Sequence, residues 1–254
     1  MSKDFLEKMY GLSRRRAEKL VKPADFPFPV RQFKTVLKDM AVIAEVKYAT
    51  PKDGMLGITD DPASIARDYE RLGASAISCL TEPTYFAGSL EYLSAIRSSC
   101  DLPLMMKDFI VDERQILAGR ALGADSFLLI TEMLSLEELK GLYACGKGLG
   151  MDCLVEVHGS DGLEKACSLG VEIIGVNSRD LKTLRVDPFR HEELVRLIPA
   201  GAVRVAESGI DSGERLRELR AMGYDAALIG RAFAKDTLRE EIFHVGQDLR
   251  NNQA

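Results

Sequence analysis

Short apolar segments alternate with longer charged segments through most of the chain, from about Ala41 onward. The apolar segments are rich in Val, Ile, Ala and Leu, as expected for strands that are buried on both faces of a parallel sheet. Each is short enough to be a strand rather than a helix. They are AVIAEVK (41–47), ASAISCLT (74–81), LPLMMK (102–107), DSFLLIT (125–131), DCLVEV (152–157), EIIGVN (172–177), AVRVAE (202–207) and DAALIG (225–230).

The charged segments between them carry apolar residues at every third or fourth position, which is the spacing of an amphipathic helix. Several of these segments begin with Ser or Asp, residues that favour helix N-caps because their side chains accept hydrogen bonds from the first backbone N–H groups. The helical candidates include 61–72, 89–99, 112–122, 135–147 and 212–222.

Eight strands that alternate with helices, with no long linker to divide them, predict a parallel sheet. A doubly wound open sheet is the competing architecture. The even spacing of the eight units, and the lack of a GxGxxG motif after the first strand, favour a (β/α)8 TIM barrel, which typically occupies about 250 residues. We therefore expect one domain over residues 1–254, with an N-terminal helical extension at 1–40 and the barrel at 41–254.

The first forty residues lie outside the repeat. A charged helix is predicted from Asp4 to about Val21, and its basic run Arg14–Arg16 is interpreted as a solvated face. The segment PADFPFPV (23–30) contains too much proline for regular structure. We expect its two phenylalanines, Phe26 and Phe28, to pack the extension against the barrel, over its mouth.

The overall charge of the chain limits the kinds of molecule that it is expected to bind. A net charge of −5 and a pI near 5.4 argue against a general nucleic-acid binder. No apolar run reaches the roughly 20 residues of a membrane helix, and the first twenty residues do not resemble a signal peptide. The five cysteines form no CxxC pair and the three histidines are scattered, so we expect reduced thiols, a cytoplasmic location and no metal.

Charged or amide side chains stand at the carboxyl ends of several predicted strands. These residues are Glu45, Lys47, Lys107, Glu156, Asn177 and Glu207. One such residue alone is compatible with a loop cap, but six at the same end of one barrel predict an active-site mouth, where neighbouring charges supply acids and bases with shifted pKa values.

Two glycines follow the last two barrel strands, Gly209 in ESGI (207–210) and Gly230 in IGRAF (229–233). Each alone is compatible with an ordinary turn. Together they occupy the place where barrels commonly bind a phosphate through backbone N–H groups and a short helix. The pattern predicts a small, phosphorylated, anionic substrate.

Six segments together resemble the indole-3-glycerol phosphate synthase family, in the same order from Ala41 to Phe233. The most specific of them are the KDFIVD and GVNSRDL motifs. The segments are IAEVKYATPKDG (43–54), LTEPTYFAGSLEYL (80–93), LPLMMKDFIVDERQI (102–116), LVEVHGSDGLEKA (154–166), IIGVNSRDLKTLRVD (173–187) and VAESGI (205–210).

The resemblance implies a (β/α)8 barrel whose N-terminal extension helps to cover the active site. It also implies the conversion of 1-(2-carboxyphenylamino)-1-deoxyribulose 5-phosphate into indole-3-glycerol phosphate, with release of carbon dioxide and water. This reaction belongs to tryptophan biosynthesis and makes the enzyme a carboxy-lyase. No metal and no organic cofactor are implied.

The resemblance also implies roles for the residues at the mouth. Lys107 is the acid that polarises the substrate carbonyl during ring closure, and Glu156 acts in the later dehydration with Glu45 and Lys47 beside it. Whether Lys47 or Glu156 is the acid in dehydration stays open. Asn177 is expected to orient the substrate and Lys107.

The remaining residues are implied to bind the substrate. Glu207, Ser208 and Arg179 contact its polar parts, and an apolar slot holds its aromatic ring, although each apolar residue is also explained by packing. The slot consists of Phe86, Phe109, Leu128 and Leu181, and the phosphate group is held by Lys47, Thr50, Gly209, Gly230 and Arg231.

Three places in the chain depart from the family pattern. Met106 stands where the family often has Arg or Leu, and alternation along the strand predicts that it points outward. Thr50 stands where a serine is more common and keeps a hydroxyl group. Thr131 and Glu132 are more polar than usual and add a carboxylate near the mouth, with an effect on substrate affinity or loop closure that the sequence leaves open.

Two other functions compete with this interpretation. Phosphoribosylanthranilate isomerase is also a phosphate-binding barrel, but it uses a cysteine at the end of its first strand, where this chain has Glu45 and Lys47. A non-catalytic barrel subunit is expected to have lost some of the six mouth residues. The expected partner is a small phosphorylated molecule rather than a nucleic acid or a membrane, and the expected assembly is a monomer or weak homodimer.

Overall fold

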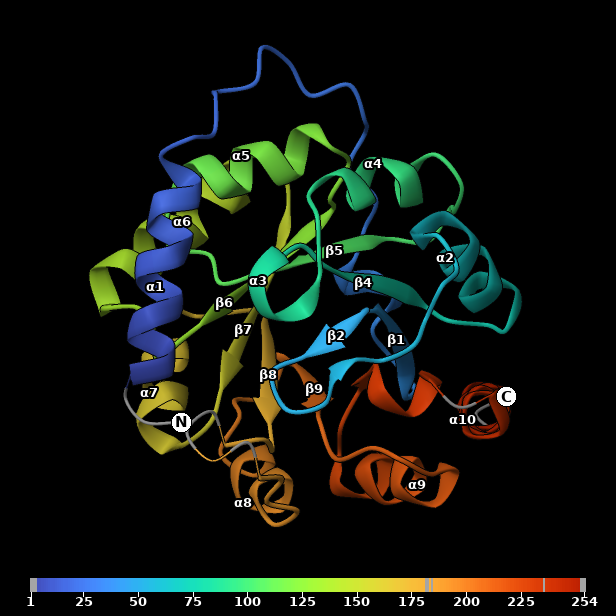
Figure 1. The fold of residues 1–254 in the computed structure, drawn as a ribbon. Helices are drawn as coiled ribbons and strands as arrows, with labels where there is room; N and C mark the ends of the chain where they lie inside the picture. Colours follow the sequence, from blue (N-terminus) through green and yellow to red (C-terminus); the bar gives the residue numbers. More distant parts are fainter. Residues whose placement is uncertain (1–3, 181–182, 184, 235, 252–254) are drawn as a thin grey trace.

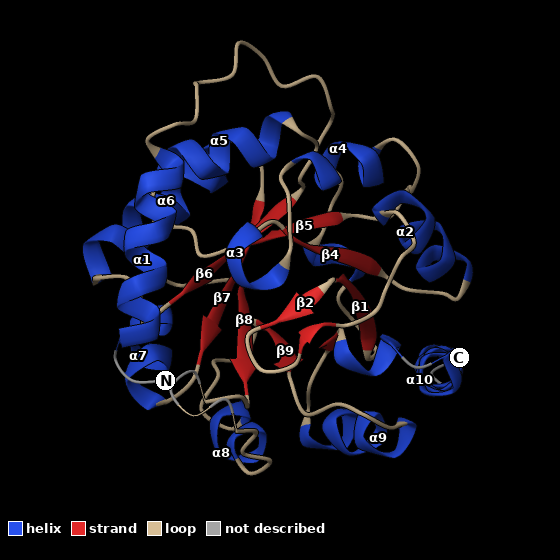
Figure 2. Ribbon diagram, viewed as in Figure 1, coloured by secondary structure: helices blue, strands red, loops and turns tan. Residues whose placement is uncertain are grey.

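A closed barrel of parallel strands forms the centre of the protein (Figures 1 and 2). The computed structural model describes residues 4–180, 183, 185–234 and 236–251. Hydrogen bonding follows the order β1-β10-β9-β8-β7-β6-β5-β4 and returns to β1, so the sheet is closed. The barrel strands are β1 (Ala41–Val46), β4 (Ala76–Leu80), β5 (Leu104–Lys107), β6 (Ser126–Ile130), β7 (Asp152–Val157), β8 (Ile173–Asn177), β9 (Val203–Glu207) and β10 (Ala226–Ile229).

Helices surround the barrel and connect successive strands, so the TIM barrel predicted from the sequence is confirmed and the open sheet is wrong. Predicted N-caps are also present, because the side chains of Asp61, Asp112, Ser135 and Ser212 accept bonds from backbone N–H groups. The helices are α1 (Asp4–Ala17), α2 (Pro62–Arg71), α3 (Pro83–Phe86), α4 (Glu91–Arg97), α5 (Glu113–Ala121), α6 (Leu136–Gly148), α7 (Ser160–Ser168), α8 (Arg190–Val195), α9 (Gly213–Met222) and α10 (Asp236–Asn251), with short 3-10 turns η1 (Lys34–Val36) and η2 (Arg231–Ala234).

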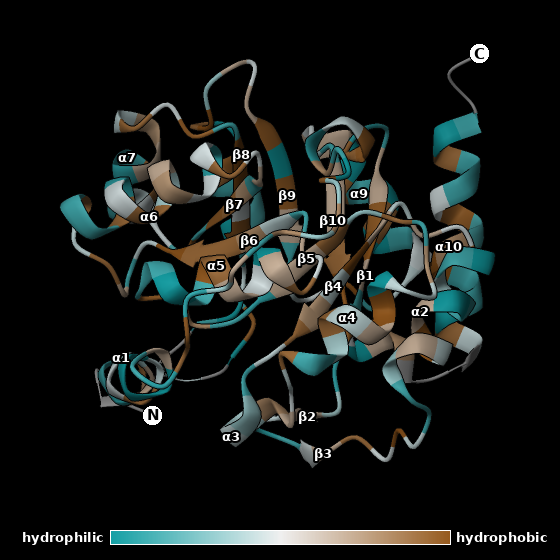
Figure 3. Cartoon of the chain, turned by 90° about the horizontal axis from the view of Figure 1, so that it is seen from above, coloured by the Kyte–Doolittle hydropathy of each residue, from teal (hydrophilic) through white to brown (hydrophobic). Residues whose placement is uncertain are grey.

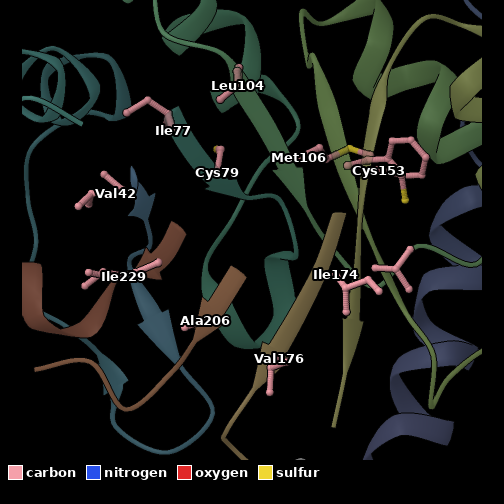
Figure 4. Close-up of a cluster of buried hydrophobic side chains, with 14 of the residues drawn as sticks. Val42, Ile77, Cys79, Leu104, Met106, Cys153, Ile174, Val176, Ala206 and Ile229 are labelled. Carbon is pink, nitrogen blue, oxygen red and sulfur yellow. The ribbon is translucent and has the colours of Figure 1, made fainter. Parts of the chain in front are cut away.

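Side chains that alternate along each strand divide the core into two layers. Met105 points into the barrel, where it packs with residues such as Ile43 and Leu154. Its neighbour Met106 points outward into the layer between strands and helices (Figure 4). Apolar residues fill most of both layers, and the buried carboxylates Glu45, Glu156 and Glu207 lie toward the carboxyl ends of their strands.

The carboxyl ends of the strands are covered by three elements that lie beyond the same end of the barrel (Figure 3). One is α1, the second is α3, and the third is a small antiparallel hairpin of β2 (Ala49–Thr50) and β3 (Gly54–Met55). Three contacts fasten α1 there: Arg16 pairs with Asp108, Arg14 pairs with Asp112, and the Tyr10 hydroxyl donates to Glu138. The extension therefore forms part of the mouth.

The first helix is shorter than the sequence predicts, since it ends at Ala17 rather than near Val21. The backbone tightens immediately after it, where the N–H groups of Lys19 and Leu20 bond to carbonyls three residues earlier. Pro23 follows, and a proline disfavours helical backbone in the residue before it. The helix therefore stops before the proline-rich segment.

The expected position of Phe26 and Phe28 over the mouth is wrong. The guanidinium of Arg120 on α5 lies over the Phe26 ring, and that of Arg97 at the end of α4 lies over Phe28. Arg97 also pairs with Asp125, which immediately precedes β6 and so lies at the opposite end of the barrel from the mouth. The segment thus crosses the outside of the barrel, because cation–π contacts to two helices hold its rings there. None of the helices in the described ranges has the length and apolarity that spanning a membrane requires.

Candidate active site

The carboxyl ends of the strands enclose a cavity of about 670 Å³, within the range that small-molecule sites occupy. The cavity brings together the residues predicted from sequence, apart from Leu181, which lies outside the described residues. Lining it are Glu45, Lys47, Thr50, Phe86, Lys107, Phe109, Leu128, Glu156, Asn177, Arg179, Glu207, Ser208, Gly209, Gly230 and Arg231.

Lys107 lies between two carboxylates at the floor of the cavity. Its Nζ is 2.9 Å from Glu207 Oε2 and 3.3 Å from Glu156 Oε2. Lys107 ends β5, Glu207 ends β9 and Glu156 is the penultimate residue of β7. These strands are not neighbours in the barrel, so closure of the sheet is what brings the three residues together. Both carboxyl groups are almost fully buried, at 2 % exposure for Glu156 and 1 % for Glu207. Such burial is tolerated because the charges are paired.

The three groups have different charge states. Burial alone would lower the pKa of Lys107, but the charges of Glu207 and Glu156 outweigh it and raise this pKa above its ordinary value. Burial raises the pKa of Glu207; the charge of Lys107 acts to lower it, but burial together with the charge of Glu156 keeps it above its ordinary value. Burial also acts to raise the pKa of Glu156, but the charges of Lys107 and His158 and a hydrogen bond from Asn177 lower it overall. The site therefore holds an ammonium, an ionised carboxylate and a carboxyl group that tends to stay protonated.

A second lysine–carboxylate pair lies across the mouth. Lys47 Nζ contacts Glu45 Oε1, and the two side chains share one face because they are two residues apart. Gly230 makes room for this pair, since a Cβ at that position would collide with Glu45 Oε1 and lie 2.9 Å from Lys47 Nζ. Gly230, which the sequence predicts to bind phosphate, thus also leaves the space in which Glu45 and Lys47 meet.

The predicted phosphate side of the cavity is polar and strongly turned. Thr50 accepts a bond from the Asp53 backbone N–H at 2.9 Å, and Arg231 Nη2 lies 3.4 Å from Asp53 Oδ1. Ser208 has a φ of 66° and Gly209 a φ of 67°. Such a conformation costs energy in a non-glycine residue like Ser208, and it is typical of functional sites. Small residues, together with the cations Lys47 and Arg231 that line the same cavity, suit an anionic group.

The apolar side of the cavity is formed by aromatic rings. Phe86 lies 6.1 Å from Phe109 between ring centroids, and Leu128 lines the same wall. Phe5 of α1 completes it, in an edge contact with Phe109 at 6.1 Å. Phe5 was not predicted from the sequence, because the extension has no periodic relation to the barrel and its helix alone does not indicate which residue faces the mouth.

Other residues missed from sequence act behind the cavity. Arg16 donates to both oxygens of Asp108, the residue after Lys107. Gly175, inside β8, leaves space for Glu207, because a Cβ there would collide with Glu207 Oε1. His158 lies beside Glu156. Of these, Gly175 carried a usable signal, since a glycine within a strand often marks a close approach. Among the described residues, no group of three or more His, Cys, Asp or Glu is arranged to hold a metal.

Comparison with known proteins identifies relatives of this barrel. The family model of indole-3-glycerol phosphate synthase matches residues 6–244. An indole-3-glycerol phosphate synthase of Campylobacter jejuni is 46 % identical over 207 residues, covering 82 % of this chain and 80 % of the relative. That of Acetivibrio thermocellus is 47 % identical over 197 residues, covering 78 % and 76 %.

A structural relative supports the fold alone. The thiamine phosphate pyrophosphorylase of Pyrococcus furiosus superposes with a TM-score of 0.63 at 16 % identity, covering 86 % of this chain and 99 % of the other. The match to the family model over nearly the whole chain and the sequence identity to its members agree with the geometry of the cavity. The chain belongs to the indole-3-glycerol phosphate synthase family.

Proposed function

We propose that this cavity converts 1-(2-carboxyphenylamino)-1-deoxyribulose 5-phosphate into indole-3-glycerol phosphate, with Lys107 as the acid of ring closure. The chain is a carboxy-lyase of tryptophan biosynthesis, as its family membership shows. The observation that supports the role of Lys107 is its position between Glu156 and Glu207 at the floor of the cavity. The ammonium there is mostly shielded from solvent and lines the cavity in which the substrate would bind.

Ring closure requires a proton at the substrate carbonyl. As the ring carbon that bears the carboxylate attacks C2′, a carbon–carbon bond forms and the carbonyl oxygen gains negative charge. Lys107 donates a proton to that oxygen, which becomes a hydroxyl group. The carboxylate then leaves as carbon dioxide, and its bonding electrons return to the ring. Before it leaves, the same lysine is also a suitable partner for its charge.

Dehydration then requires one base and one acid. The C2′–oxygen bond breaks as the hydroxyl group takes a proton and leaves as water, and a proton is removed from C1′ to form the double bond. Glu156 suits the base because Lys107, His158 and Asn177 keep it ionised. We assign the acid to Lys47, whose ammonium is held at the mouth by Glu45.

The substrate is proposed to span the cavity from its apolar to its polar side. Phe86, Phe109 and Leu128, with Phe5 of the extension, would hold the aromatic ring. Thr50, Gly209, Gly230 and Arg231, together with Lys47, would hold the phosphate, and Ser208 and Arg179 would contact the polar chain and the carboxylate. Glu207 Oε1 is buried and has no hydrogen-bond partner in the described part of the chain, so a substrate hydroxyl would satisfy it.

The two competing functions fit the cavity less well. An isomerase of the phosphoribosylanthranilate type needs a cysteine base, yet none of the five cysteines lines the cavity, and Cys79 is buried in the outer layer. A non-catalytic subunit has no need for buried lysine–carboxylate pairs, which are costly to bury.

We further propose that a single chain, as a monomer or weak homodimer, is sufficient for activity. Every residue with an assigned role belongs to one chain, and the extension at 1–40 contributes Phe5 to the same cavity, in keeping with one domain over 1–254. The five cysteines are free thiols, which fits a cytoplasmic protein.

The test is a direct assay of both reactions. The purified protein is incubated with the carboxyphenylamino-deoxyribulose phosphate, and indole-glycerol phosphate is followed by its fluorescence. A parallel reaction contains phosphoribosylanthranilate. Formation of indole-glycerol phosphate without isomerisation is expected. Isomerisation without formation of indole-glycerol phosphate would favour the competing enzyme, and inactivity of the folded protein toward both would favour the non-catalytic barrel.

A further inference from the structure

A chain of polar contacts leads from Glu132, in the turn after β6, to the catalytic carboxylate Glu156. Glu132 follows β6, and its Oε1 accepts the backbone N–H of His158 at 2.9 Å. Its Oε2 lies 3.0 Å from His158 Nδ1. On the other side of the imidazole, Nε2 lies 3.2 Å from Glu156 Oε1. Glu156 in turn contacts Lys107 through its other oxygen, Oε2.

The histidine is held in this position from several directions. Its side chain is 9 % exposed, and Nε2 is buried without an aligned hydrogen-bond partner among the described residues. The contact from His158 Nε2 to Glu156 is therefore an electrostatic contact between close groups and not an aligned hydrogen bond. The hydroxyl of Thr131 donates to Glu132 Oε2 at 3.0 Å, and Lys165 of α7 donates to the carbonyls of Thr131 and Leu134. These bonds fix the turn that carries Glu132.

The groups that face His158 are mostly acidic. Glu132 comes from the turn after β6, Glu156 from β7 and Glu207 from β9, and Lys107 of β5 lies beyond Glu156. The lysine on the adjoining helix, Lys165, is directed at backbone oxygens, and Asp161 at the start of α7 is paired with Ser160. Burial acts to lower the pKa of His158, but the bond to Glu132 and the charges of Glu156 and Glu132 raise it.

Glu156 needs a second cation for a chemical reason that rests on the function proposed above. When Lys107 turns to the substrate carbonyl, it gives up its contact with Glu156, and a buried carboxylate without a cation tends to take up a proton. We infer that Glu132 and His158 are positioning residues, in which Glu132 holds His158 as a fixed cation that keeps Glu156 ionised and in place during turnover. Neither residue contacts the substrate in this arrangement.

The inference is tested first by NMR, without any turnover. The imidazole titrations of wild type and Glu132→Gln are compared, and His158→Gln identifies the His158 signal among the three histidines. Loss of the carboxylate charge is expected to lower the pKa of His158. The carboxyl titration of Glu156, followed by carbon-13 labelling, is expected to move up by roughly one pH unit, because an opposite charge at this distance typically lowers a carboxyl pKa by 1–3 units.

The second test is the pH dependence of kcat. A base must be ionised, so the acidic limb of the profile reports Glu156. Glu132→Gln and His158→Gln are both expected to move this limb to higher pH and to lower kcat about tenfold at pH values below it, because one pH unit changes the ionised fraction tenfold. Glu132→Asp keeps the charge and is expected to keep the limb. The matched control is Asp248→Asn, which neutralises the carboxylate 3.5 Å from the exposed His244 and is expected to change nothing.

The results separate this inference from the proposed reaction. If the His158 and Glu156 titrations are the same in wild type and Glu132→Gln, the inference is overturned, whether or not the protein is active. A purely structural role for Glu132 would lower the thermal stability of Glu132→Gln without moving either titration. If the titrations move as expected but indole-glycerol phosphate is not formed, the inference about the contacts holds and the proposed reaction fails.

Discussion

Glu156 and Glu207 contact the same ammonium group but differ in their charge states. Burial and the neighbouring carboxylate raise the pKa of Glu207, whereas Lys107 and His158 lower that of Glu156. In a buried site, one carboxyl group usually keeps its proton when two share a cation, because two uncompensated charges are costly. This difference fits the proposed function, in which Glu156 is the base and Glu207 is a hydrogen-bonding group on the other side of Lys107.

This difference predicts unequal effects of the same substitution. Glutamine resembles a protonated glutamate but is no base, so Glu156→Gln is expected to lower kcat by roughly 10²–10⁴-fold, the typical contribution of a general base. Glu207→Gln is expected to cost about tenfold or less, mainly in KM, because the neutral form is already the favoured one. Steady-state kinetics of both variants, with circular dichroism to verify folding, provide the comparison. A larger loss for Glu207→Gln would reverse the assignment.

The sequence predicted most individual residues of the site, but it did not predict which of their side chains contact one another. Lys107, Glu156 and Glu207 each stand at the end of a strand, and that position alone marks them as residues of the mouth. Their partners depend on distances across the closed barrel, between strands that are far apart in the chain. His158 is an example, because it lies one residue beyond β7 and its role becomes visible only next to Glu132.

At the level of single elements, β8 must leave space for a carboxylate of its neighbour. Gly175 is in register with Glu156 of β7 and Val205 of β9, and the space that a Cβ would need is occupied by Glu207 Oε1 and Leu154. Neither a strand backbone nor a buried carboxylate can move far in a closed barrel. The absence of a side chain at Gly175 is thus required for the observed position of Glu207.

Gly175→Ala is therefore expected to displace Glu207 from Lys107. We expect the loss to appear in KM and in kcat together, and the free energy of unfolding to fall by roughly 1–3 kcal/mol, as is typical of overpacking. Urea denaturation and steady-state kinetics measure the two effects. Gly141→Ala on α6, where an added Cβ meets nothing within 4 Å, serves as the control. Normal kinetics in Gly175→Ala would show that Glu207 has more room than the structure indicates.

Long elements were predictable because they repeat a pattern over many residues. The caps at Asp61, Ser135 and Ser212 placed three helix starts within a residue of those observed. The β2–β3 hairpin, α3 and η2 were not predicted, since two to four residues are too short to show any periodicity. All three contribute residues to the cavity or cover it.

For the molecule as a whole, one buried histidine, His191, links several elements of the barrel. His191 of α8 is 1 % exposed, with Nε2 at 3.1 Å from the Glu207 carbonyl and Nδ1 at 3.2 Å from Arg215 of α9. Burial, together with the charge of Arg215, lowers its pKa to about 4. The native state therefore favours neutral His191, whereas the unfolded chain binds a proton near the ordinary value of 6.5.

The stability that neutral His191 provides is fully present above pH 6.5 and is lost as the pH falls toward 4. For a shift of this size, the loss is about 3 kcal/mol. Urea denaturation of wild type and His191→Gln at several pH values isolates the effect, since other titrating groups contribute equally to both. The stability difference between the two proteins is expected to shrink on acidification. His244→Gln, at an exposed histidine, is the control, and a difference that is constant with pH would contradict the assignment.

The barrel itself follows from the sequence because eight evenly spaced apolar segments leave few alternatives. The path of the extension does not, because it depends on particular contacts such as Arg16 with Asp108 at the mouth and Phe28 with Arg97 on the outer helices. A phenylalanine in a proline-rich segment packs wherever a complementary surface lies. The sequence pattern does not indicate where on the barrel such a segment packs.

The most direct measurement is the turnover of the carboxyphenylamino-deoxyribulose phosphate by wild type, Lys107→Ala and the exposed control Lys140→Ala. Lys107→Ala is expected to stay folded and to lose at least the roughly 10²–10⁴-fold that a general acid contributes, while Lys140→Ala turns over normally. Near-normal turnover by Lys107→Ala would contradict the assignment of the ammonium between Glu156 and Glu207 as the acid of ring closure.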